Sequence, residues 1–135
     1  MTEIRVDVRP LRAEDEPLLF GLAQLDRGAD RRTLDVLEDE TVFVAEVGGG
    51  PAGYVAVDLT PAAARVDQLF VSPEHEGEGV GRRLLEYAEG YAISQGAATL
   101  QVVVENENRR AQDFYRGRGF VPVSENVLEL VLPQA

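Results

Sequence analysis

The residues of this chain that could do chemistry gather first in one stretch, LFVSPEHEGEGVGRRLLEY, which covers Leu69 to Tyr87. An apolar run that reads as a strand ends at Pro73, because proline has no N–H for a strand ladder. Three alternating glycines follow, namely Gly77, Gly79 and Gly81. A strand, a glycine-rich turn and a helix start leave backbone N–H groups unpaired, and the helix dipole adds positive charge there. The stretch therefore predicts a site for an anion, most naturally a phosphate.

Two nucleotide-binding motifs do not fit this stretch. A P-loop ends in Gly-Lys-Ser/Thr, whereas Gly81 is followed by Arg82 and Arg83, with no hydroxyl for a magnesium ion. The dinucleotide fingerprint would need a glycine at position 82, early in a repeated βαβ pattern. The two arginines suit a bound phosphate better than they suit the helix start itself. A glycine-rich turn without any ligand stays open as the alternative.

A second informative stretch, TLQVVVENENRRAQDFYRGRGF, covers Thr99 to Phe120. The β-branched run over 100–104 predicts a strand, and Asn106-Glu107-Asn108 has the composition of a helix cap. A helix is expected from Arg109 until the glycines at 117 and 119 end it, and Phe120 then begins another strand.

Three residues of that helix fall at i, i+3 and i+7, namely Asn108, Ala111 and Tyr115. They are expected to share one face, and an amide, a small residue and a phenol suit a narrow ligand groove. The tyrosine hydroxyl is a candidate proton donor. The alternative is a half-buried tyrosine with a satisfied hydroxyl, and Phe114 beside it is expected in the core.

Together the two stretches resemble the GNAT-type N-acetyltransferases. That family shows V-x-P-x-x-(Arg/Gln)-G-x-G-(apolar)-G before a helix, and here residues 71–81 read VSPEHEGEGVG. It then shows Asn-x-x-Ala-x-x-Phe-Tyr and a closing Gly-Phe, and here residues 108–120 read NRRAQDFYRGRGF. The two motifs occur in the family's order, with one expected helix and one expected strand between them.

The resemblance implies a single GNAT domain over residues 1–135, an α/β (α+β) fold whose mixed, mostly antiparallel central sheet is flanked by helices. It implies acetyl-CoA as co-substrate, no metal, and transfer of an acetyl group to a primary amine of a small molecule or peptide. Carried over residue by residue, the expected cofactor-binding residues are Leu69, Phe70, Val71, Glu76, Gly77, Glu78, Gly79, Val80, Gly81, Arg82, Arg83, Asn108, Ala111 and Tyr115.

The chemistry implied is direct attack of a neutral amine on the thioester, between the ends of the strands at 65–71 and 100–104. A backbone N–H near Phe70 or Val71 is expected to stabilise the oxyanion, and Tyr115 to protonate the departing thiolate. Asp67 and Glu105 are both candidates for the base that deprotonates the ammonium, and a chain of waters is a third.

Glu76 departs from the family pattern, which has arginine or glutamine at this position. A carboxylate that faced a pyrophosphate would weaken binding, whereas one that pointed to solvent would not. The departure keeps a second class of function open, a catalytically silent acyl-CoA sensor or interaction module with the same fold.

Composition limits the partners of this 135-residue chain. A net charge of −11 argues against nucleic acid and anionic membranes and favours a cationic amine. The chain has no cysteine and one histidine, His75, which is expected to be an exposed loop residue. No apolar stretch approaches bilayer length and no secretory signal is recognisable, so we expect a cytoplasmic monomer or homodimer.

The remaining elements follow from alternation, turn residues and helical periodicity. Strands are expected over 4–9, 41–47, 52–59, 65–71 and 128–132, with a hairpin at Gly48-Gly49-Gly50-Pro51. Helices are expected over 13–25, 30–38 and from Val80, the last with an inward face of Val80, Leu84, Tyr87, Ala88 and Tyr91. The expected order, β-α-α-β-β-β-α-β-α-β, is that of the GNAT fold.

Overall fold

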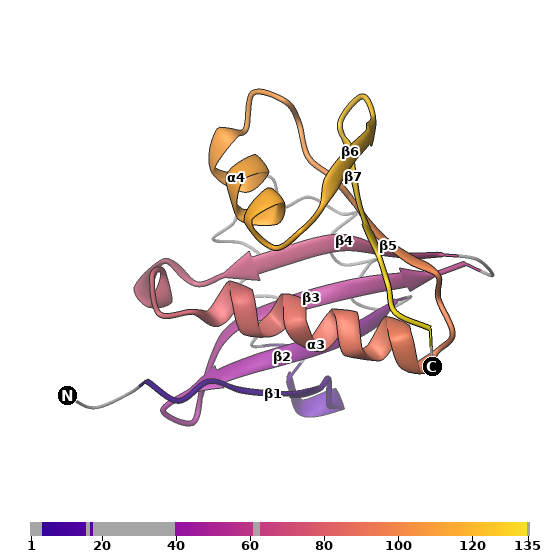
Figure 1. Ribbon diagram of the computed structural model, residues 1–135. Coiled ribbons are helices and arrows are strands. Elements are labelled where there is room, and N and C mark those ends of the chain that lie inside the picture. Colours follow the sequence, from indigo (N-terminus) through magenta and orange to yellow (C-terminus); the bar gives the residue numbers. More distant parts are fainter. Residues whose placement is uncertain (1–3, 16, 18–39, 61–62, 135) are drawn as a thin grey trace. The chain divides into compact units, whose positions relative to one another are not determined.

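Strands dominate the computed structural model, which describes residues 4–15, 17, 40–60 and 63–134 (Figure 1). In chain order the elements are β1 (Asp7–Pro10), the 3-10 helix η1 (Ala13–Asp15), β2 (Thr41–Val47), β3 (Gly50–Leu59), β4 (Ala63–Val71), the 3-10 helix η2 (Pro73–His75), α3 (Val80–Ser94), β5 (Thr99–Val103), α4 (Arg109–Gly117), β6 (Val121–Ser124) and β7 (Val127–Val131). Neighbouring strands hydrogen-bond in the order β1-β2-β3-β4-β5-β7-β6.

The sheet is mixed, as expected. β4 and β5 pair in parallel. The pairs β1–β2, β2–β3, β5–β7 and β6–β7 are antiparallel. A parallel pair requires a crossover connection, and α3 provides it between β4 and β5.

The chain forms two units, and we describe each by itself. The first comprises Met1–Val57 and Gln68–Ala88, and the second comprises Asp58–Asp67 and Glu89–Ala135. Both β4 and α3 run from one unit into the other, so neither element belongs to one unit alone.

The core of the first unit lies around β2 and β3. Val42, Val44, Tyr54 and Ala56 are buried together, and Phe70 of β4 packs against them. The Tyr54 hydroxyl donates to Gln68 Oε1 at 2.8 Å, which satisfies the one polar atom of this fully buried ring.

Gly53 permits a close backbone approach in the same unit. A Cβ at this position would collide with the Phe70 carbonyl oxygen and would lie 3.3 Å from Leu84 Cδ1. Only glycine therefore lets β3 pass this close to the end of β4 and to the first turns of α3.

The core of the second unit lies around β5, β7 and α4. Leu100 and Leu128 are fully buried on neighbouring strands. The Tyr115 ring stands edge-on to Phe120, with centroids 5.4 Å apart, and edge-on to Phe114 at 5.1 Å. Phe114 was predicted to lie in the core, but it is only partly buried.

The predicted strands and the last two helices are confirmed within a few residues at each end. β2 has the predicted bounds, whereas β1 begins at Asp7 and includes Pro10. Of the helix predicted over 13–25, the structure describes the 3-10 turn η1; most of the remainder and the helix predicted over 30–38 lie outside the described residues.

Two details differ from the expectations. The buried stripe of α3 is Val80, Leu84, Leu85, Ala88 and Ala92, so the prediction that Tyr87 faces inward is wrong. Tyr87 is 39% exposed and lies at the edge of the stripe, where its ring contacts Phe43 with centroids 4.7 Å apart.

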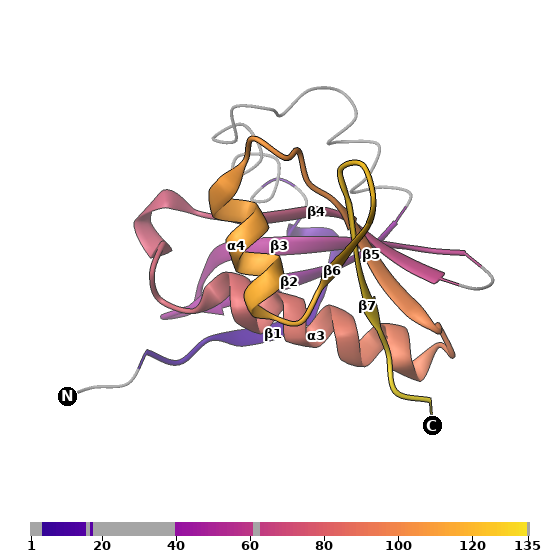
Figure 2. The same ribbon diagram turned by 45° about the horizontal axis from the view of Figure 1, so that its top comes forward.

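The second difference lies after α4. The structure has two strands there, β6 and β7, and Figure 2 shows them as a hairpin. The sequence predicted both, one beginning at Phe120 and one over 128–132, but the expected element order counted only one of them. Asn126 turns this hairpin with a φ of 61°, a conformation that asparagine tolerates better than most residues. None of the described helices combines the length and the apolar character that a membrane span requires.

Candidate functional site

The predicted glycine-rich turn connects η2 to α3 in the first unit. Beyond the end of β4, Ser72 N donates to Ala52 O at 2.7 Å, which ties the exit of the strand to β3. Gly77 and Gly79 then have φ values of +79° and +84°. These left-handed conformations are strained for residues with a side chain, so the glycine spacing is required by the course of the backbone.

The start of α3 leaves backbone donors without helical partners. The first bond of the helix runs from Arg83 N to Gly79 O at 3.1 Å. The N–H groups of Val80, Gly81 and Arg82 precede that bond, and donors at this position have no intrahelical acceptor. Because Val80 is fully buried, it anchors the turn that presents them. This arrangement suits an anion, as the sequence predicted.

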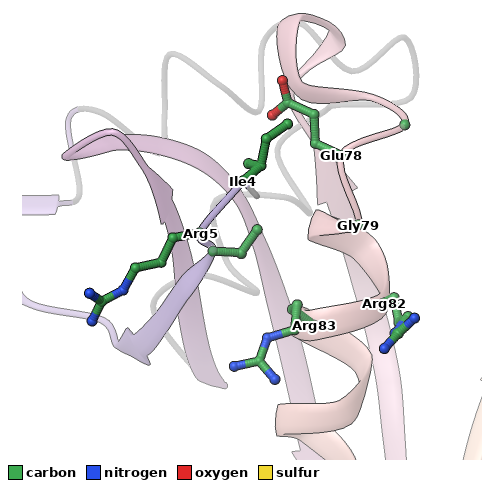
Figure 3. A pocket seen from close by; sticks show the side chains of 8 residues that line it. Ile4, Arg5, Glu78, Gly79, Arg82 and Arg83 are labelled. Atoms are coloured by element: carbon green, nitrogen blue, oxygen red, sulfur yellow. The ribbon is translucent and has the colours of Figure 1, made fainter. Parts of the chain in front are cut away.

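Arg82 and Arg83 add two cations to this helix start. Figure 3 shows their side chains leaving α3 on different sides. Arg82 Nε lies 3.1 Å from Glu86 Oε1, and Arg83 Nη1 lies 3.4 Å from Glu86 Oε2. Both arginine side chains are more than half exposed, so these pairs hold them only weakly and an anion can compete with Glu86.

The acidic residues of the turn differ in their surroundings. Glu76 is exposed. Glu78 is half-buried, and its Oε2 lies 2.7 Å from His75 Nδ1. The prediction that His75 is an exposed loop residue is therefore wrong, because the ring is partly buried and bridges η2 to the turn.

A cavity of about 750 Å³ opens beside this turn in the first unit. Its lining residues are Ile4, Arg5, Val6, Gly77, Glu78, Gly79, Arg82 and Arg83. Five of these were predicted as cofactor-binding residues, whereas the segment before β1 was not. In Figure 3 Ile4 and Arg5 lie across the cavity from the start of α3. Sequence reasoning missed them because no local pattern marks a segment seventy residues away as a neighbour of the turn.

The end of β4 carries the predicted residues Leu69, Phe70 and Val71, all partly buried. β4 pairs with β5 only over Ala63–Val66 and Thr99–Val102. The sequence predicted that these two strands lie side by side and then diverge. The parallel pairing is present, and the described ladder ends before Leu69 is reached.

Tyr115 lies on α4 in the second unit and is 5% exposed. Burial raises the pKa of its phenol above the usual value, because the low-dielectric surroundings disfavour the phenolate. Among the described residues the hydroxyl has no hydrogen-bond partner. The alternative of a tyrosine with a satisfied hydroxyl therefore has no support here.

Asn108 caps α4 rather than lying along its face. Its Oδ1 accepts a hydrogen bond from Ala111 N at 3.2 Å, which is the usual geometry of an N-cap. Gln112, which the sequence did not single out, is buried and donates from Nε2 to Val104 O at 3.1 Å. These bonds fix the helix that carries Tyr115 against the end of β5.

The two candidate bases also lie in the second unit. Both oxygens of Asp67 accept hydrogen bonds from Arg65, whose Nη2 also lies 3.2 Å from Asp58 Oδ2. Glu105 is exposed, and its backbone oxygen accepts from Asn108 N at 3.0 Å. Of the two carboxylates, only that of Asp67 is engaged by an arginine among the interactions we observe.

The predicted residues thus fall into two groups. The first unit contains the end of β4 and the turn from Glu76 to Arg83. The second unit contains Asp67, Glu105, Asn108, Ala111 and Tyr115. Each unit holds one half of the predicted chemistry, anion binding in the first and proton transfer in the second.

Comparison with known proteins gives a family match over most of the chain. Residues 6–120 match the model of the acetyltransferase (GNAT) family. An uncharacterised N-acetyltransferase of Methanocaldococcus jannaschii is 33% identical over 90 residues, which cover 62% of this chain and 40% of that protein. A streptothricin acetyltransferase of Streptomyces lavendulae is 36% identical over 85 residues, covering 61% of this chain and 45% of that protein. The matches thus span about half the length of these curated relatives or less.

Solved structures share the fold at low sequence identity. A putative GNAT acetyltransferase of Desulfovibrio desulfuricans matches with a TM-score of 0.84 at 16% identity, over 96% of this chain and 100% of the other. A GNAT acetyltransferase of Elizabethkingia anophelis, solved with acetyl-CoA bound, matches with a TM-score of 0.81 at 16% identity, over 94% of this chain and 98% of the other.

Proposed function

The chain belongs to the acetyltransferase (GNAT) family, and from this premise we propose that it moves the acetyl group of acetyl-CoA to a primary amine. The observation that carries the proposal is the start of α3. Three helical N–H groups precede the first bond of the helix, two glycines hold the turn at positive φ, and two arginines flank it. This is a site for a diphosphate, and acetyl-CoA is the co-substrate that the family uses.

The proposed binding roles follow the elements of the first unit. Within the turn from Gly77 to Arg83, the N–H groups that precede the first helical bond, those of Val80, Gly81 and Arg82, hold the pyrophosphate. Main-chain groups of Leu69, Phe70 and Val71, at the end of β4, pair with the extended pantetheine arm. Glu76 is exposed, so solvent screens its charge from the phosphates.

The proposed reaction is direct transfer. The co-substrate supplies an acyl thioester, and the amine nitrogen forms a bond to the carbonyl carbon as the carbon–sulfur bond breaks. A backbone N–H near Phe70 or Val71 stabilises the oxyanion, and Tyr115 donates a proton to the departing sulfur. The acylated nitrogen then loses a proton, which restores the Tyr115 phenol and leaves the neutral amide and free thiol. Burial raises the pKa of Tyr115, so the phenol is protonated at neutral pH, which is the form that a proton donor needs.

A base must take the proton that the ammonium loses before attack. Glu105 and Asp67 are the two side chains we propose, and a chain of waters is the third route. The engagement of Asp67 by Arg65 favours Glu105, because a carboxylate that already accepts two hydrogen bonds has less capacity to accept a proton.

We propose a small-molecule or peptide amine as acceptor. The net charge of −11 supports a cationic amine, since the field of the whole protein raises the local concentration of cations. The name of the Streptomyces lavendulae relative, streptothricin acetyltransferase, is compatible with a small-molecule acceptor. One domain, a cytoplasmic location and a monomeric or homodimeric state stay predictions from the sequence.

Release of free coenzyme A from acetyl-CoA tests the proposal with a panel of polyamines, amino acids, aminoglycosides and peptide N-termini. A thiol reagent reports the release directly, because the chain has no cysteine of its own. We expect coenzyme A release that depends on an amine. The same amine should gain about 42 Da for each acetyl group, because one acetyl group replaces one N–H hydrogen. Binding of acetyl-CoA without release across the whole panel would instead identify the silent sensor or interaction module.

A further inference from the structure

The cavity beside the turn has a second wall, formed by Ile4, Arg5 and Val6. We propose that this segment receives the nucleotide end of coenzyme A and that Arg5 is a specificity residue for its 3′-phosphate. The inference rests on the proposed function and extends the site to a part of the chain that the sequence did not indicate.

The size of the cavity is the first support. Its volume of about 750 Å³ lies within the range of roughly 300–1,000 Å³ that is typical of small-molecule sites. A pyrophosphate on the helix start is far smaller than this volume. The cavity therefore has room for the ribose and base that follow the pyrophosphate in coenzyme A.

The chemistry of the walls is the second support. Ile4 is 49% exposed and lines the cavity, so it offers an apolar surface to a flat base. Arg5 and Arg83 line the cavity from opposite walls. In Figure 3 the Arg83 side chain leaves α3 on the side of Arg5, and the long Arg5 side chain extends away from α3, so it has to turn back toward the cavity to reach a bound phosphate. A phosphate monoester carries nearly two negative charges at neutral pH, and arginine binds phosphate in a bidentate manner.

The acidic groups around the cavity leave donors on Arg5. Its Nε donates to Asp7 Oδ1 at 3.0 Å, and the side chains of this pair are 86% and 59% exposed. Such a pair contributes little, and a guanidinium has five N–H donors, so its terminal nitrogens can still bind a phosphate. Glu86 holds Arg82 and Arg83 similarly, while Glu78 is paired with His75.

The position of Arg5 is fixed by the strand that follows it. In β1, Asp7 pairs with Glu46 of β2. Arg9 makes a bidentate pair with Asp15 at 2.7 Å for both bonds and also donates from Nε to Glu46 Oε1 at 2.7 Å. Arg9 in this pair holds the pKa of the Asp15 carboxyl below its usual value, so the pair persists at neutral pH. The segment is thus anchored two residues after Arg5, which limits the ordering cost of binding.

A ligand pair and a variant pair test the proposal in the full chain. We measure by calorimetry the Kd of coenzyme A and of 3′-dephospho-coenzyme A for the wild type and for Arg5→Gln. We expect the wild type to prefer coenzyme A by about tenfold, the scale of one charge-assisted contact. Arg5→Gln should lose most of that preference while its Kd for the dephospho ligand changes less than about twofold.

Arg12→Gln is the matched control. Arg12 is also an exposed arginine in the N-terminal part of the chain, 4.0 Å from Glu14, and it does not line the cavity. Loss of this charge should leave the preference for coenzyme A intact. Arg5→Lys keeps the charge without the bidentate geometry, so an intermediate preference is expected.

Three results would overturn the inference. An unchanged preference in Arg5→Gln, whether or not the binding of both ligands weakens equally, would give Arg5 a role unrelated to the 3′-phosphate. A wild type that binds both ligands equally and still transfers acetyl groups would refute the inference but leave the proposed function standing. A wild type that binds neither ligand would refute both.

Discussion

The turn from Gly77 to Arg83 contributes to the proposed reaction through backbone groups, whereas the helix α4 contributes through a side chain. The turn is largely exposed and offers backbone N–H groups, so its proposed role depends on the main-chain conformation at Gly77 and Gly79. The helix offers the buried side chain of Tyr115, whose proposed role depends on its hydroxyl. Binding of acetyl-CoA should therefore be sensitive to backbone changes in the turn. Turnover should instead be sensitive to loss of the Tyr115 hydroxyl oxygen.

Removal of that oxygen gives the largest expected effect. Tyr115→Phe should lower turnover about 10²-fold, within the range of general acid catalysis, while the Kd for acetyl-CoA changes little. Steady-state kinetics and calorimetry on the same preparation measure the two quantities. Tyr87→Phe is the control, since it removes the same atom from an exposed tyrosine on α3. Equal turnover in the wild type and Tyr115→Phe would make Tyr115 a packing residue.

A backbone change in the turn should have the complementary effect. Gly79→Val forces a β-branched residue into a φ of +84° and should weaken acetyl-CoA binding at least tenfold, because the N–H groups lose their alignment. Gly96→Val is the matched control, because Gly96 has a φ of +80° and also has open space around it. Both variants should lose stability by roughly 1–3 kcal/mol, but only Gly79→Val should lose the ligand. Similar binding by both variants would contradict the role of the turn.

The burial of Tyr115 also predicts a dependence of stability on alkaline pH. The pKa of the folded state is raised, so the stabilisation is fully present below the unfolded value of about 10 and is lost as the pH rises above it. The free energy of unfolding should fall by up to about 1.4 kcal/mol per pH unit from this group. Tyr115→Phe should reduce the pH dependence of the free energy of unfolding. Urea titrations from about pH 9 to about pH 11, roughly one unit on each side of the reference pKa, measure it. An unchanged slope would mean that the phenol ionises equally well in both states.

Glu76→Gln should have the smallest effect. Solvent screens the charge of the exposed Glu76 side chain, so we expect the binding free energy of acetyl-CoA to change by less than about 0.5 kcal/mol. Tightening by about 1 kcal/mol would place the carboxylate near the phosphates instead. Weaker binding would imply that Glu76 helps to hold the turn in place.

Much of the first unit's site could be predicted because its signals are local. The glycine spacing from 77 to 81, Pro73 and the apolar pattern from Val80 act over a few residues, and positive φ angles show why positions 77 and 79 are glycine. In the second unit the Asn108 cap and the end of α4 near Gly117 and Gly119 were predicted for the same reason.

What the sequence did not reveal depends on contacts between distant residues. Arg5 lines the cavity because β1 pairs with β2. Asp15 is buried where it pairs with Arg9, which also donates to Glu46. Tyr87 was predicted to face inward, whereas it lies at the edge of the buried stripe of α3. Helical periodicity alone does not give the width of that stripe. His75 was predicted to be exposed because a single histidine in a sequence does not indicate its partner. In the structure its Nδ1 contacts Glu78.

Thermal unfolding of the wild type with and without acetyl-CoA tests the central claim most directly, that the turn before α3 binds the phosphates of this co-substrate. Binding to the folded state alone stabilises by about 2.7 kcal/mol at a hundredfold excess over Kd. For a chain of 135 residues this should raise the melting temperature by roughly 10 °C. The rise should persist in Tyr115→Phe and disappear in Gly79→Val. A melting curve that acetyl-CoA leaves unmoved in the wild type would contradict the claim.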